Sequence, residues 1–429
     1  MKTSFLRWMI EHGELDSKLA ELYGEEAVED QRYRYIRAID EFSINFDSDC
    51  KDRDIYLFSV SGRSEICGNH TDHNCGLVIG CAVNLDLIAV ASPTSDRMIN
   101  LKSAGYPLDT VSFDKLSPSE CNKFSSSAII AGICSGFEKR GYALGGFDAY
   151  TTNNVYKGSG LSSSAAFEVA VGTMMSCLHN GGSVDPVEIA KISQYAEREF
   201  FGKACGLMDQ AVCAVGGLVM IDFEKEDEPK IEKLNADISK YGYSMCITNT
   251  GGSHANLSDD YSAVPAEMKK IADFFGRNVL RGLTMEQIIN KMPELRDFAG
   301  DRAILRAMHF IEENDRVTAL RTAMEGGDMP AFIETILDSG RSSYQLLQNI
   351  YSNKAPEQQG ISLALAVTEF LLKDKKSAWR VHGGGFAGTI QAFVPNEYTE
   401  HYRQGMDAVF GKGACTVMRT RNVGAVRLA

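Results

Sequence analysis

Apolar residues recur along the first part of the chain with two different periods, and each period predicts one kind of element. Leucines at the i, i+4 and i+7 positions within residues 14–23 mark one face of an amphipathic helix. Residues 55–60 and 77–92 are apolar stretches typical of strands, and polar and ionisable side chains dominate the segment between them. We therefore predict a helix followed by two strands, with a polar loop over residues 62–76 between the strands.

A second pattern joins a strand, a glycine loop and a helix. Residues 146–153 are typical of a strand, the glycine loop occupies residues 158–164, and the small and apolar side chains that follow keep a helical period. A further helix is predicted to begin with an N-cap, an N1 proline and a capping-box glutamate and to end at a glycine, which are Asp185, Pro186, Glu188 and Gly202.

Two domains are predicted from a change of composition in the middle of the chain. The stretch 224–233 is charged and poor in apolar residues, and residues 243–248 after it are again typical of a strand. We place the boundary here, with an N-terminal domain over residues 1–224 and a C-terminal domain over residues 225–429. The C-terminal part is predicted to be rich in helices, over residues 264–275, 302–313, 317–325 and 361–373, before a strand over residues 389–394.

Composition narrows the class of protein. The 429 residues include 44 Lys plus Arg and 57 Asp plus Glu, a formal net charge of −13, which argues against nucleic acid as a partner. No stretch reaches the 18 or so apolar residues of a membrane span, and the N-terminus lacks the apolar core of a signal peptide. The 11 cysteines are scattered without a CxxC pair, as expected of reduced thiols. We expect a cytoplasmic protein that is not membrane-embedded.

The glycine loop is a candidate phosphate site. It reads Gly158, Ser159, Gly160, Leu161, Ser162, Ser163 and Ser164, and the N-terminus of the following helix offers free backbone N–H groups and a positive dipole end. No Gly-Lys-Ser/Thr follows, so it is not a Walker A loop, and Ser163 stands where a GxGxxG motif has its third glycine. The alternative is a serine-glycine turn that caps a helix.

The polar loop is a candidate ligand site. Many donors and acceptors lie close together over residues 62–74, as a polyhydroxylated ligand requires, although a solvated surface loop is the alternative. Cys67, His70, His73 and Cys75 could be interpreted as a metal cluster. Their C-x2-H-x2-H-x-C spacing matches no usual zinc site, and we reject a metal here.

Two further segments carry candidate residues. Asp209 is a single carboxylate among apolar residues in CGLMDQ, so its charge would need a cation such as Arg63 nearby; a helix N-cap is the alternative. Residues 382–388 contain four glycines between two segments of strand type. Backbone pressed against a ligand and a tight hairpin both explain that pattern.

Taken in this order, these segments resemble the signature motifs of the GHMP small-molecule kinases, and within that superfamily they are most similar to galactokinases. The galactokinase signature reads much like GR-VNLIGEHTDYN, and this chain has GRSEICGNHTDHN at residues 62–74. GSGLSSSAAFEVA, CGLMDQ (similar to CGIMDQ) and HGGGFAGT also resemble family motifs, and the resemblance spans roughly residues 55–395.

The resemblance implies a fold and a reaction. The expected fold is the two-domain GHMP kinase fold, α/β in the N-terminal domain and α+β in the C-terminal domain, with the active site in the cleft between them. The expected reaction is the transfer of a phosphoryl group from ATP to the anomeric hydroxyl of a sugar, most directly galactose, with Mg²⁺ as cofactor. A small-molecule sugar and ATP are then the partners.

The resemblance also assigns roles to residues of this chain. Asp209 corresponds to the catalytic aspartate, and Arg63 is its partner, which keeps the carboxylate charged and offsets phosphoryl charge. The glycine loop binds the ATP phosphates, and Ser164 and Glu197 match the positions that hold Mg²⁺. Contacts to the sugar are implied for Asn69, His70, Asp72, Gly206 and Tyr261.

Two departures from the galactokinase pattern bear on the substrate. Asn69 stands where galactokinases have Glu, and His73 stands where they have Tyr. Galacturonate, L-arabinose and an amino sugar therefore remain alternative acceptors, and Asn69→Glu is expected to sharpen selectivity for galactose. A sugar-sensing regulator without turnover is the alternative from another class, but the presence of both Arg63 and Asp209 argues against it.

Overall fold

The computed structural model describes residues 1–47, 52–155, 161–203, 205–225, 228–252 and 257–429. Its strands are β1 (Tyr56–Cys67), β2 (Leu77–Pro93), β3 (Met98–Ser103), β4 (Leu108–Ser112), β5 (Phe147–Asn153), β6 (Leu218–Asp222), β7 (Lys230–Leu234), β8 (Tyr243–Asn249), β9 (Ala378–His382), β10 (Thr389–Pro395), β11 (Cys415–Met418) and β12 (Val426–Arg427). Its α-helices are α1 (Thr3–Glu11), α2 (Asp16–Tyr23), α3 (Val28–Phe46), α4 (Ser126–Lys139), α5 (Ser163–His179), α6 (Pro186–Tyr195), α7 (Met208–Val215), α8 (Ser258–Phe274), α9 (Met285–Asn290), α10 (Met292–Ala299), α11 (Asp301–Gly326), α12 (Met329–Ser342), α13 (Gly360–Leu372) and α14 (Asn396–Phe410).

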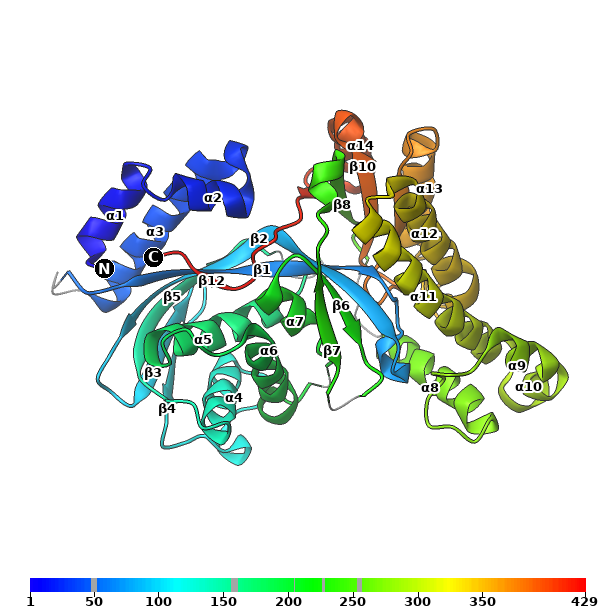
Figure 1. Cartoon of the computed structure of the whole chain (residues 1–429), viewed down its shortest axis with the longest axis horizontal. Coiled ribbons are helices and arrows are strands. Elements are labelled where there is room, and N and C mark those ends of the chain that lie inside the picture. The colour runs from blue at the N-terminus through cyan, green and yellow to red at the C-terminus, as the bar shows by residue number, and fades with distance from the viewer. Residues whose placement is uncertain (48–51, 156–160, 204, 226–227, 253–256) are drawn as a thin grey trace.

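The first sheet has the order β12-β1-β2-β5-β3-β4, and β6 and β7 extend it from β2. All its pairs are antiparallel except β3 with β5. Alternate residues of its strands point to opposite faces, so Leu57 packs with the N-terminal helices and Phe58 packs with α4 to α7. Helices therefore cover both faces of this sheet (Figure 1).

The second sheet has the order β11-β8-β10-β9 and is antiparallel throughout. Helices α13 and α14 pack on one of its faces, and α11 and α12 pack near the other. The long β1–β2 hairpin reaches into this half of the molecule, where Ile66 and Ile79 join α11, α12 and β8 in one apolar cluster (Figure 1). The hairpin thus carries residues of the N-terminal part to the second sheet.

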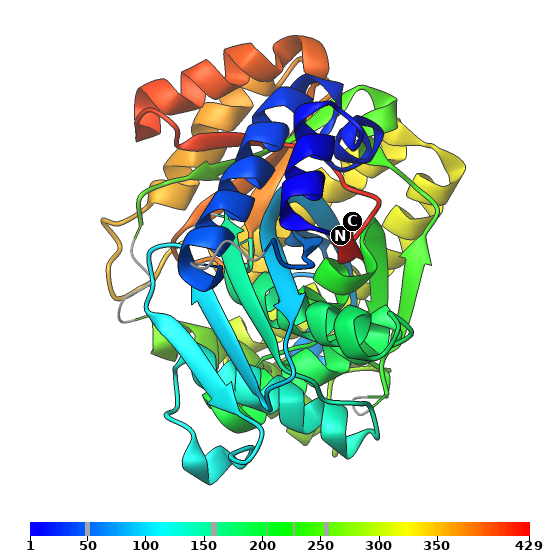
Figure 2. The same ribbon diagram turned by 90° about the vertical axis from the view of Figure 1, so that its left-hand side faces the viewer.

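The two ends of the chain meet beside the first three helices (Figure 2). Strand β12 pairs with β1, and the backbone N–H of Leu57 donates to the carbonyl of Ala429 at 3.0 Å. Strands β7 and β12 of the first sheet both lie beyond residue 224, so the division into domains 1–224 and 225–429 stays a proposal.

Several predicted elements are confirmed. The helix over residues 14–23 is α2, with its leucines buried, and the strand over 146–153 is β5. The helix capped by Asp185 is α6, which continues as a π-helical turn up to Gly202. None of the helices within the described ranges is long and apolar enough to cross a bilayer.

Three details differ from the sequence prediction. Strand β1 continues to Cys67, so the polar loop comprises only residues 68–76, because residues 62–67 still pair with β2. The periodic segments 302–313 and 317–325 form one helix, α11, since the residues between them are helix-compatible. Glu188 completes no capping box and pairs with Arg140 of α4 instead.

Candidate active site

Asp209 lies in the first turn of α7 and faces Arg63 of β1. Arg63 donates two hydrogen bonds to the carboxylate, from Nε to Oδ1 at 2.7 Å and from Nη2 to Oδ2 at 2.6 Å. The hydroxyl of Ser162 also donates to Oδ2. The backbone N–H of Arg63 donates to the carbonyl of Leu161 at 3.2 Å. The structure thus joins the predicted catalytic pair to the end of the predicted phosphate loop.

These contacts keep Asp209 ionised. Burial alone would raise the pKa of Asp209, but the charge of Arg63 and the hydrogen bonds from Arg63 and Ser162 outweigh it and hold the pKa below its ordinary value. A bidentate arginine also fixes the plane of the carboxylate. Asp209 is therefore a charged, oriented acceptor that remains about one-third exposed.

The predicted phosphate loop is described only in part. Gly158, Ser159 and Gly160 lie outside the described residues. Leu161 is buried, Ser162 has the left-handed φ of 57°, and Ser163 and Ser164 open α5. The described part of the loop therefore ends at a helix N-terminus, which is where a phosphate would be bound.

Glu197 sits in the π-helical turn Ala196–Phe201 and is almost fully buried. Lys203 Nζ donates to its Oε1 at 2.9 Å, and Gln210 Nε2 donates to its Oε2 at 2.8 Å. The same Gln210 nitrogen donates to Oε2 of Glu168 in α5 at 3.0 Å. Ser164 lies on α5 one turn before Glu168 and on the same helix face, while Gln210 joins Glu168 to Glu197.

Glu168 and Glu197 bring two buried carboxyl groups close to Gln210. Burial and the charge of Glu197 raise the pKa of Glu168 to about 8. Among the described residues, Glu168 Oε1 and Gln210 Oε1 are buried without a hydrogen-bond partner. Oxygen ligands of this kind are the ones that Mg²⁺ takes. Lys203 Nζ pairs with Glu197 in the described structure, and Mg²⁺ at Glu197 stays a prediction.

Two predicted sugar residues, Asp72 and Gly206, lie next to each other. A Cβ on Gly206 would come within 3.1 Å of Asp72 Oδ2, so the loop before α7 and the polar loop are in contact. His70 of the polar loop has φ of 58° and its Nε2 lies 3.0 Å from the carbonyl of Gly384. Burial lowers the pKa of His70 to about 4, so the ring is neutral at pH 7 and Nε2 carries the proton donated to that carbonyl.

Tyr261 of α8 packs against residues 383–385, which we call the glycine turn. Its hydroxyl donates to the carbonyl of Gly385 at 2.9 Å, and its ring lies edge-on to Phe386. A Cβ on Gly384 would approach Tyr261 Cε1 to 2.7 Å, so a side chain there would displace the ring. The glycine turn thus packs closely against another segment of the chain. Its glycines are explained by this close packing as well as by the turn between β9 and β10.

Asn69 is buried, and its side chain is engaged in hydrogen bonds to other residues. Its Nδ2 donates to Glu65 Oε1 at 2.9 Å and to the carbonyl of Gly383 at 2.7 Å. Its Oδ1 accepts from Asn349 Nδ2 at 2.8 Å, and only 1% of the residue is exposed. The expectation that the Asn69 side chain faces the sugar is therefore not supported by these contacts, because its donors and acceptor already have partners within the chain.

His382, Gln210 and Glu168 belong to the site and were missed from the sequence. His382 Nε2 lies 3.0 Å from Ser64 Oγ, next to Arg63, and burial lowers the pKa of His382 to about 3. Gln210 connects Glu168 and Glu197 as described above. All three residues lie inside the motifs quoted for the family resemblance, at HGGGFAGT, CGLMDQ and GSGLSSSAAFEVA, and that position is the only signal that could have found them.

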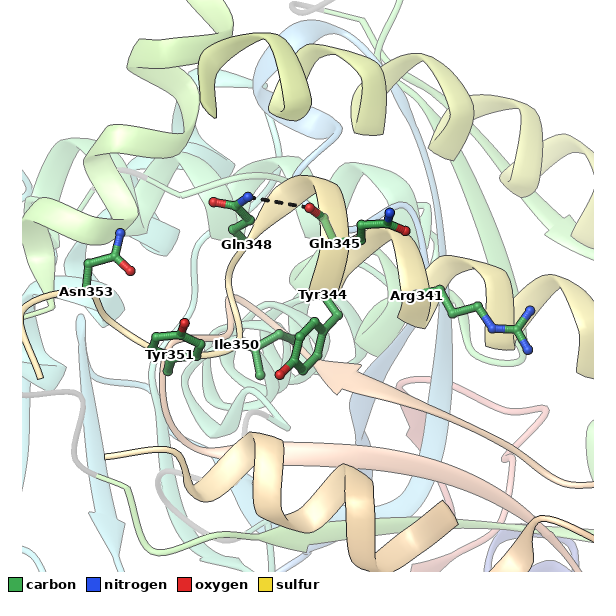
Figure 3. A pocket seen from close by; sticks show the side chains of 7 residues that line it. All are labelled: Arg341, Tyr344, Gln345, Gln348, Ile350, Tyr351 and Asn353. Atoms are coloured by element: carbon green, nitrogen blue, oxygen red, sulfur yellow. Dashed lines mark hydrogen bonds between the residues drawn. The ribbon is translucent and has the colours of Figure 1, made fainter. Parts of the chain in front are cut away.

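The candidate metal cluster, the cysteines and the cavity of the structure are not part of the site around Asp209. No group of three or more His, Cys, Asp or Glu side chains that could hold a metal ion occurs among the described residues. The ten cysteines in the described ranges are free thiols. A cavity of about 630 Å³ lies at the end of α12 and is lined by other residues, namely Arg341, Tyr344, Gln345, Gln348, Ile350, Tyr351 and Asn353 (Figure 3).

Two family models match the N-terminal half of the chain. The model of the GHMP kinases N terminal domain matches residues 125–217, which contain Ser162, Glu197 and Asp209. The model of the galactokinase galactose-binding signature matches residues 40–93, which contain Arg63 and the polar loop. Asp209 and its partner Arg63 therefore fall within two separate matches.

Solved structures share the fold over most of their length. Galactokinase of Lactococcus lactis, in complex with galactose, is 21% identical with a TM-score of 0.74, covering 90% of this chain and 98% of that one. Mevalonate kinase of Methanococcus jannaschii is 13% identical with a TM-score of 0.58, covering 86% and 98%. The D-glycero-D-manno-heptose 1-phosphate kinase of Bacteroides thetaiotaomicron is 14% identical with a TM-score of 0.56, covering 86% and 97%.

The predicted fold class is confirmed by these structures, since the mixed α/β architecture of the chain matches them over nearly its whole length. The family models add the sequence evidence that structural likeness at such low identity lacks. Residues 125–217 thus match a GHMP kinase N-terminal domain and residues 40–93 match the galactose-binding signature of the galactokinases, in a chain that has the fold of these kinases, and together they indicate an ATP-dependent phosphotransferase.

Proposed function

We propose that this protein is a sugar 1-kinase that transfers a phosphoryl group from ATP to the anomeric hydroxyl of galactose. The observation that carries the proposal is the bidentate ion pair of Arg63 and Asp209. Arg63 belongs to the match with the galactose-binding signature, and Asp209 belongs to the match with the kinase domain. The pair therefore joins the sugar side and the nucleotide side of the proposed site.

Asp209 would act on the sugar hydroxyl. Its lowered pKa leaves the carboxylate ionised at neutral pH, so it accepts the hydroxyl's hydrogen bond and, as the oxygen attacks, its proton. Arg63 holds the carboxylate in one orientation, and its charge offsets the negative charge of the transferring phosphoryl group. Positioning and charge stabilisation are the main tasks of a phosphoryl-transfer site.

ATP and Mg²⁺ would enter from the side of α5. The loop before α5, residues 158–164, would hold the ATP phosphates through backbone N–H groups at the helix N-terminus. Glu197 and Ser164 would hold Mg²⁺, which supplies charge neutralisation at the phosphate oxygens. The buried oxygens Glu168 Oε1 and Gln210 Oε1, which have no hydrogen-bond partner, support a cation beside Glu197.

The sugar would be bound by the polar loop and the segment before α7. His70, Asp72 and Gly206 are the proposed contacts there, and Tyr261 is proposed to close the site from α8. The proximity of Asp72 and Gly206 supports this assignment, since two segments separated by more than 130 residues meet at one point. Because neutral His70 donates its Nε2 proton to Gly384, its Nδ1 is left as an acceptor for a sugar hydroxyl at pH 7.

The test is a turnover assay with ATP and Mg²⁺ over a sugar panel of galactose, galacturonate, L-arabinose, galactosamine and glucose. We expect galactose to give the highest kcat/KM, and ³¹P NMR of the product to show phosphate on the anomeric oxygen. A higher kcat/KM for galacturonate, L-arabinose or the amino sugar would retain the sugar kinase and replace the acceptor. Sugar binding without ADP release from any member would contradict the enzyme and favour a sugar-sensing regulator.

A further inference from the structure

Asn69 joins the polar loop to the glycine turn of the C-terminal half. Its Nδ2 donates to Gly383 and to Glu65, and its Oδ1 accepts from Asn349. The backbone carbonyl of Asn69 also lies 3.0 Å from His309 Nε2 in α11. The polar groups of this side chain thus have complementary partners both nearby, at Glu65, and in the C-terminal half, at Gly383 and Asn349.

Glu65 is the charged member of the arrangement. It lies on β1, is 8% exposed, and accepts from Arg380 Nη2 of β9 at 3.0 Å as well as from Asn69. Arg380 is itself buried and also donates to the carbonyl of Ile66 at 2.5 Å. A buried carboxylate is tolerated only with such partners. Asn69 Nδ2 and Arg380 Nη2 therefore both stabilise the buried carboxylate of Glu65.

The order of acid and amide in this pair is fixed by its neighbours. A carboxylate at position 69 would point an acceptor at two acceptors, Glu65 Oε1 and the carbonyl of Gly383. Without a gap, the galactokinase signature quoted above is GRVNLIGEHTDYN, in which Asn aligns with Glu65 and Glu aligns with Asn69 of this chain. This chain therefore holds the same two residue types in exchanged order, which leaves the net charge of the pair unchanged.

We propose that Glu65 and Asn69 are positioning residues, an exchanged acid–amide pair that, with Arg380, fixes the polar loop against the glycine turn. The loop carries His70 and Asp72, so the pair sets the distance between the proposed sugar contacts and the second sheet. This last step rests on the proposed function, whereas the coupling between the two side chains does not.

The coupling is tested by a double-mutant cycle with isosteric variants, using thermal unfolding of the full chain. Asn69→Asp places two carboxylates in contact, and Glu65→Gln removes the counter-charge of Arg380. Each is expected to lower Tm by about 5 °C or more. The double variant restores one acid and one amide, and we expect it to unfold at a higher temperature than Asn69→Asp alone.

The matched control is Asn45→Asp on α3. Its amide is exposed and bonds only to the carbonyl of Glu41 one turn earlier, so we expect Tm to change by no more than about 1 °C. A double variant that is no more stable than Asn69→Asp would overturn the acid–amide pair. This outcome is read without any substrate, so it is independent of the proposed function.

The positioning role is tested by steady-state kinetics of the double variant. We expect KM for the sugar to rise roughly tenfold while KM for ATP changes less than about twofold, because the pair holds the sugar contacts and not the glycine loop. If both KM values change equally, or neither changes, Glu65 and Asn69 form only a structural contact. That result would overturn the proposal that they position the sugar contacts. Absence of turnover in the unmodified protein would contradict the proposed function, while the Tm cycle would still decide on the pair.

Discussion

Asp209 shows how single residues set the chemistry of the site. The carboxylate is ionised because Arg63 and Ser162 donate to it, although burial alone would favour the neutral acid. Asn69 shows the opposite case: it lies inside a ligand-binding motif, but its side chain forms its hydrogen bonds with other residues of the protein. The identity of a residue therefore does not decide whether it faces substrate or holds the site in place.

Asp209→Asn is expected to lower kcat by roughly 10² or more while ATP binding and Tm stay near their original values. The reason is that the amide keeps the shape of the carboxylate but cannot accept the proton or attract Arg63 as strongly. Stopped assays for kcat, calorimetry for ATP binding and thermal unfolding for Tm provide the measurements. Asp273→Asn, an exposed residue that pairs with Lys269, is the control and should retain turnover.

Arg63→Ala is also expected to be slow, and its loss should not add to that of Asp209→Asn, because the two side chains act on one charge. Additive losses in the double variant would mean that they work separately.

The metal residues give a second prediction at this scale. Glu197→Gln is expected to raise the Mg²⁺ concentration for half-maximal turnover by about tenfold, whereas Ser162→Ala should leave it unchanged. The two differ because the Ser162 hydroxyl is directed to Asp209, while Glu197 lies among the buried carboxylates. Mn²⁺ binding followed by electron paramagnetic resonance checks the same ranking without turnover, and an unaltered metal titration in Glu197→Gln would make that residue structural.

At the scale of the elements, α11 supports the polar loop. Glu313 on this helix accepts from the backbone N–H of Gly68 at 3.1 Å and from Ser339 Oγ of α12 at 2.6 Å. Burial would raise the pKa of Glu313, but His309, Arg380 and Arg316 oppose it and bring the pKa to about 2. One buried carboxylate thus connects the polar loop, α11 and α12.

This carboxylate predicts how stability depends on pH. The folded pKa of about 2 lies below the unfolded value of about 4.3, so the stabilisation is complete above pH 4.3 and is lost as the pH falls towards 2. At pH 7 it is on the order of 3 kcal/mol. Glu313→Gln should therefore lower the free energy of unfolding at pH 7. Between pH 4.3 and 2, the free energy of unfolding of this variant should fall less steeply than that of the unmodified protein.

Denaturant unfolding of both proteins across this pH range provides the measurement. Glu312→Gln is the matched control, because its carboxylate is 43% exposed and an exposed pair with Arg316 contributes under about 1 kcal/mol. The same pH dependence in Glu313→Gln and the unmodified protein between pH 4.3 and 2 would show that folding does not lower the pKa of Glu313.

At the scale of the whole molecule, the C-terminal segment returns to the first sheet and closes a buried charge network. Arg421 is fully buried and donates from Nη1 to Ser59 Oγ at 2.7 Å, and the same atom lies 3.4 Å from Asp86 Oδ2. Tyr23 of α2 donates to Asp86 at 2.5 Å. The N-terminal helices, the β1–β2 hairpin and the end of the chain therefore depend on one another.

Arg421→Met is expected to lower the free energy of unfolding by about 3–5 kcal/mol, because it leaves the buried Asp86 with less counter-charge. The control is Arg419→Ala, which removes only an exposed ion pair with Glu26 and should cost under about 1 kcal/mol. Equal losses in urea unfolding would show that the network contributes no more than a surface pair.

Features encoded by residues close together in the sequence could be predicted without a structure. The leucines of α2, the caps of α6 and the contiguous motifs around Asp209 and the polar loop could be interpreted without a structure, because helical periods and short motifs involve residues close in sequence. The assignment of Arg63 to Asp209 also came from the motifs, and the two lie 146 positions apart.

Tertiary structure alone decided which partners the remaining polar side chains meet. Gly383 lies 314 positions from Asn69, and Asn349 lies 280 positions from it, so no local pattern could show that the Asn69 amide is buried between them. The same holds for Glu65 and Arg380, whose charges are neutralised only when the β1–β2 hairpin packs against the second sheet. Burial makes such contacts obligatory, because an unpaired polar group inside the protein is costly, and only the packing of distant elements determines which group is buried beside which.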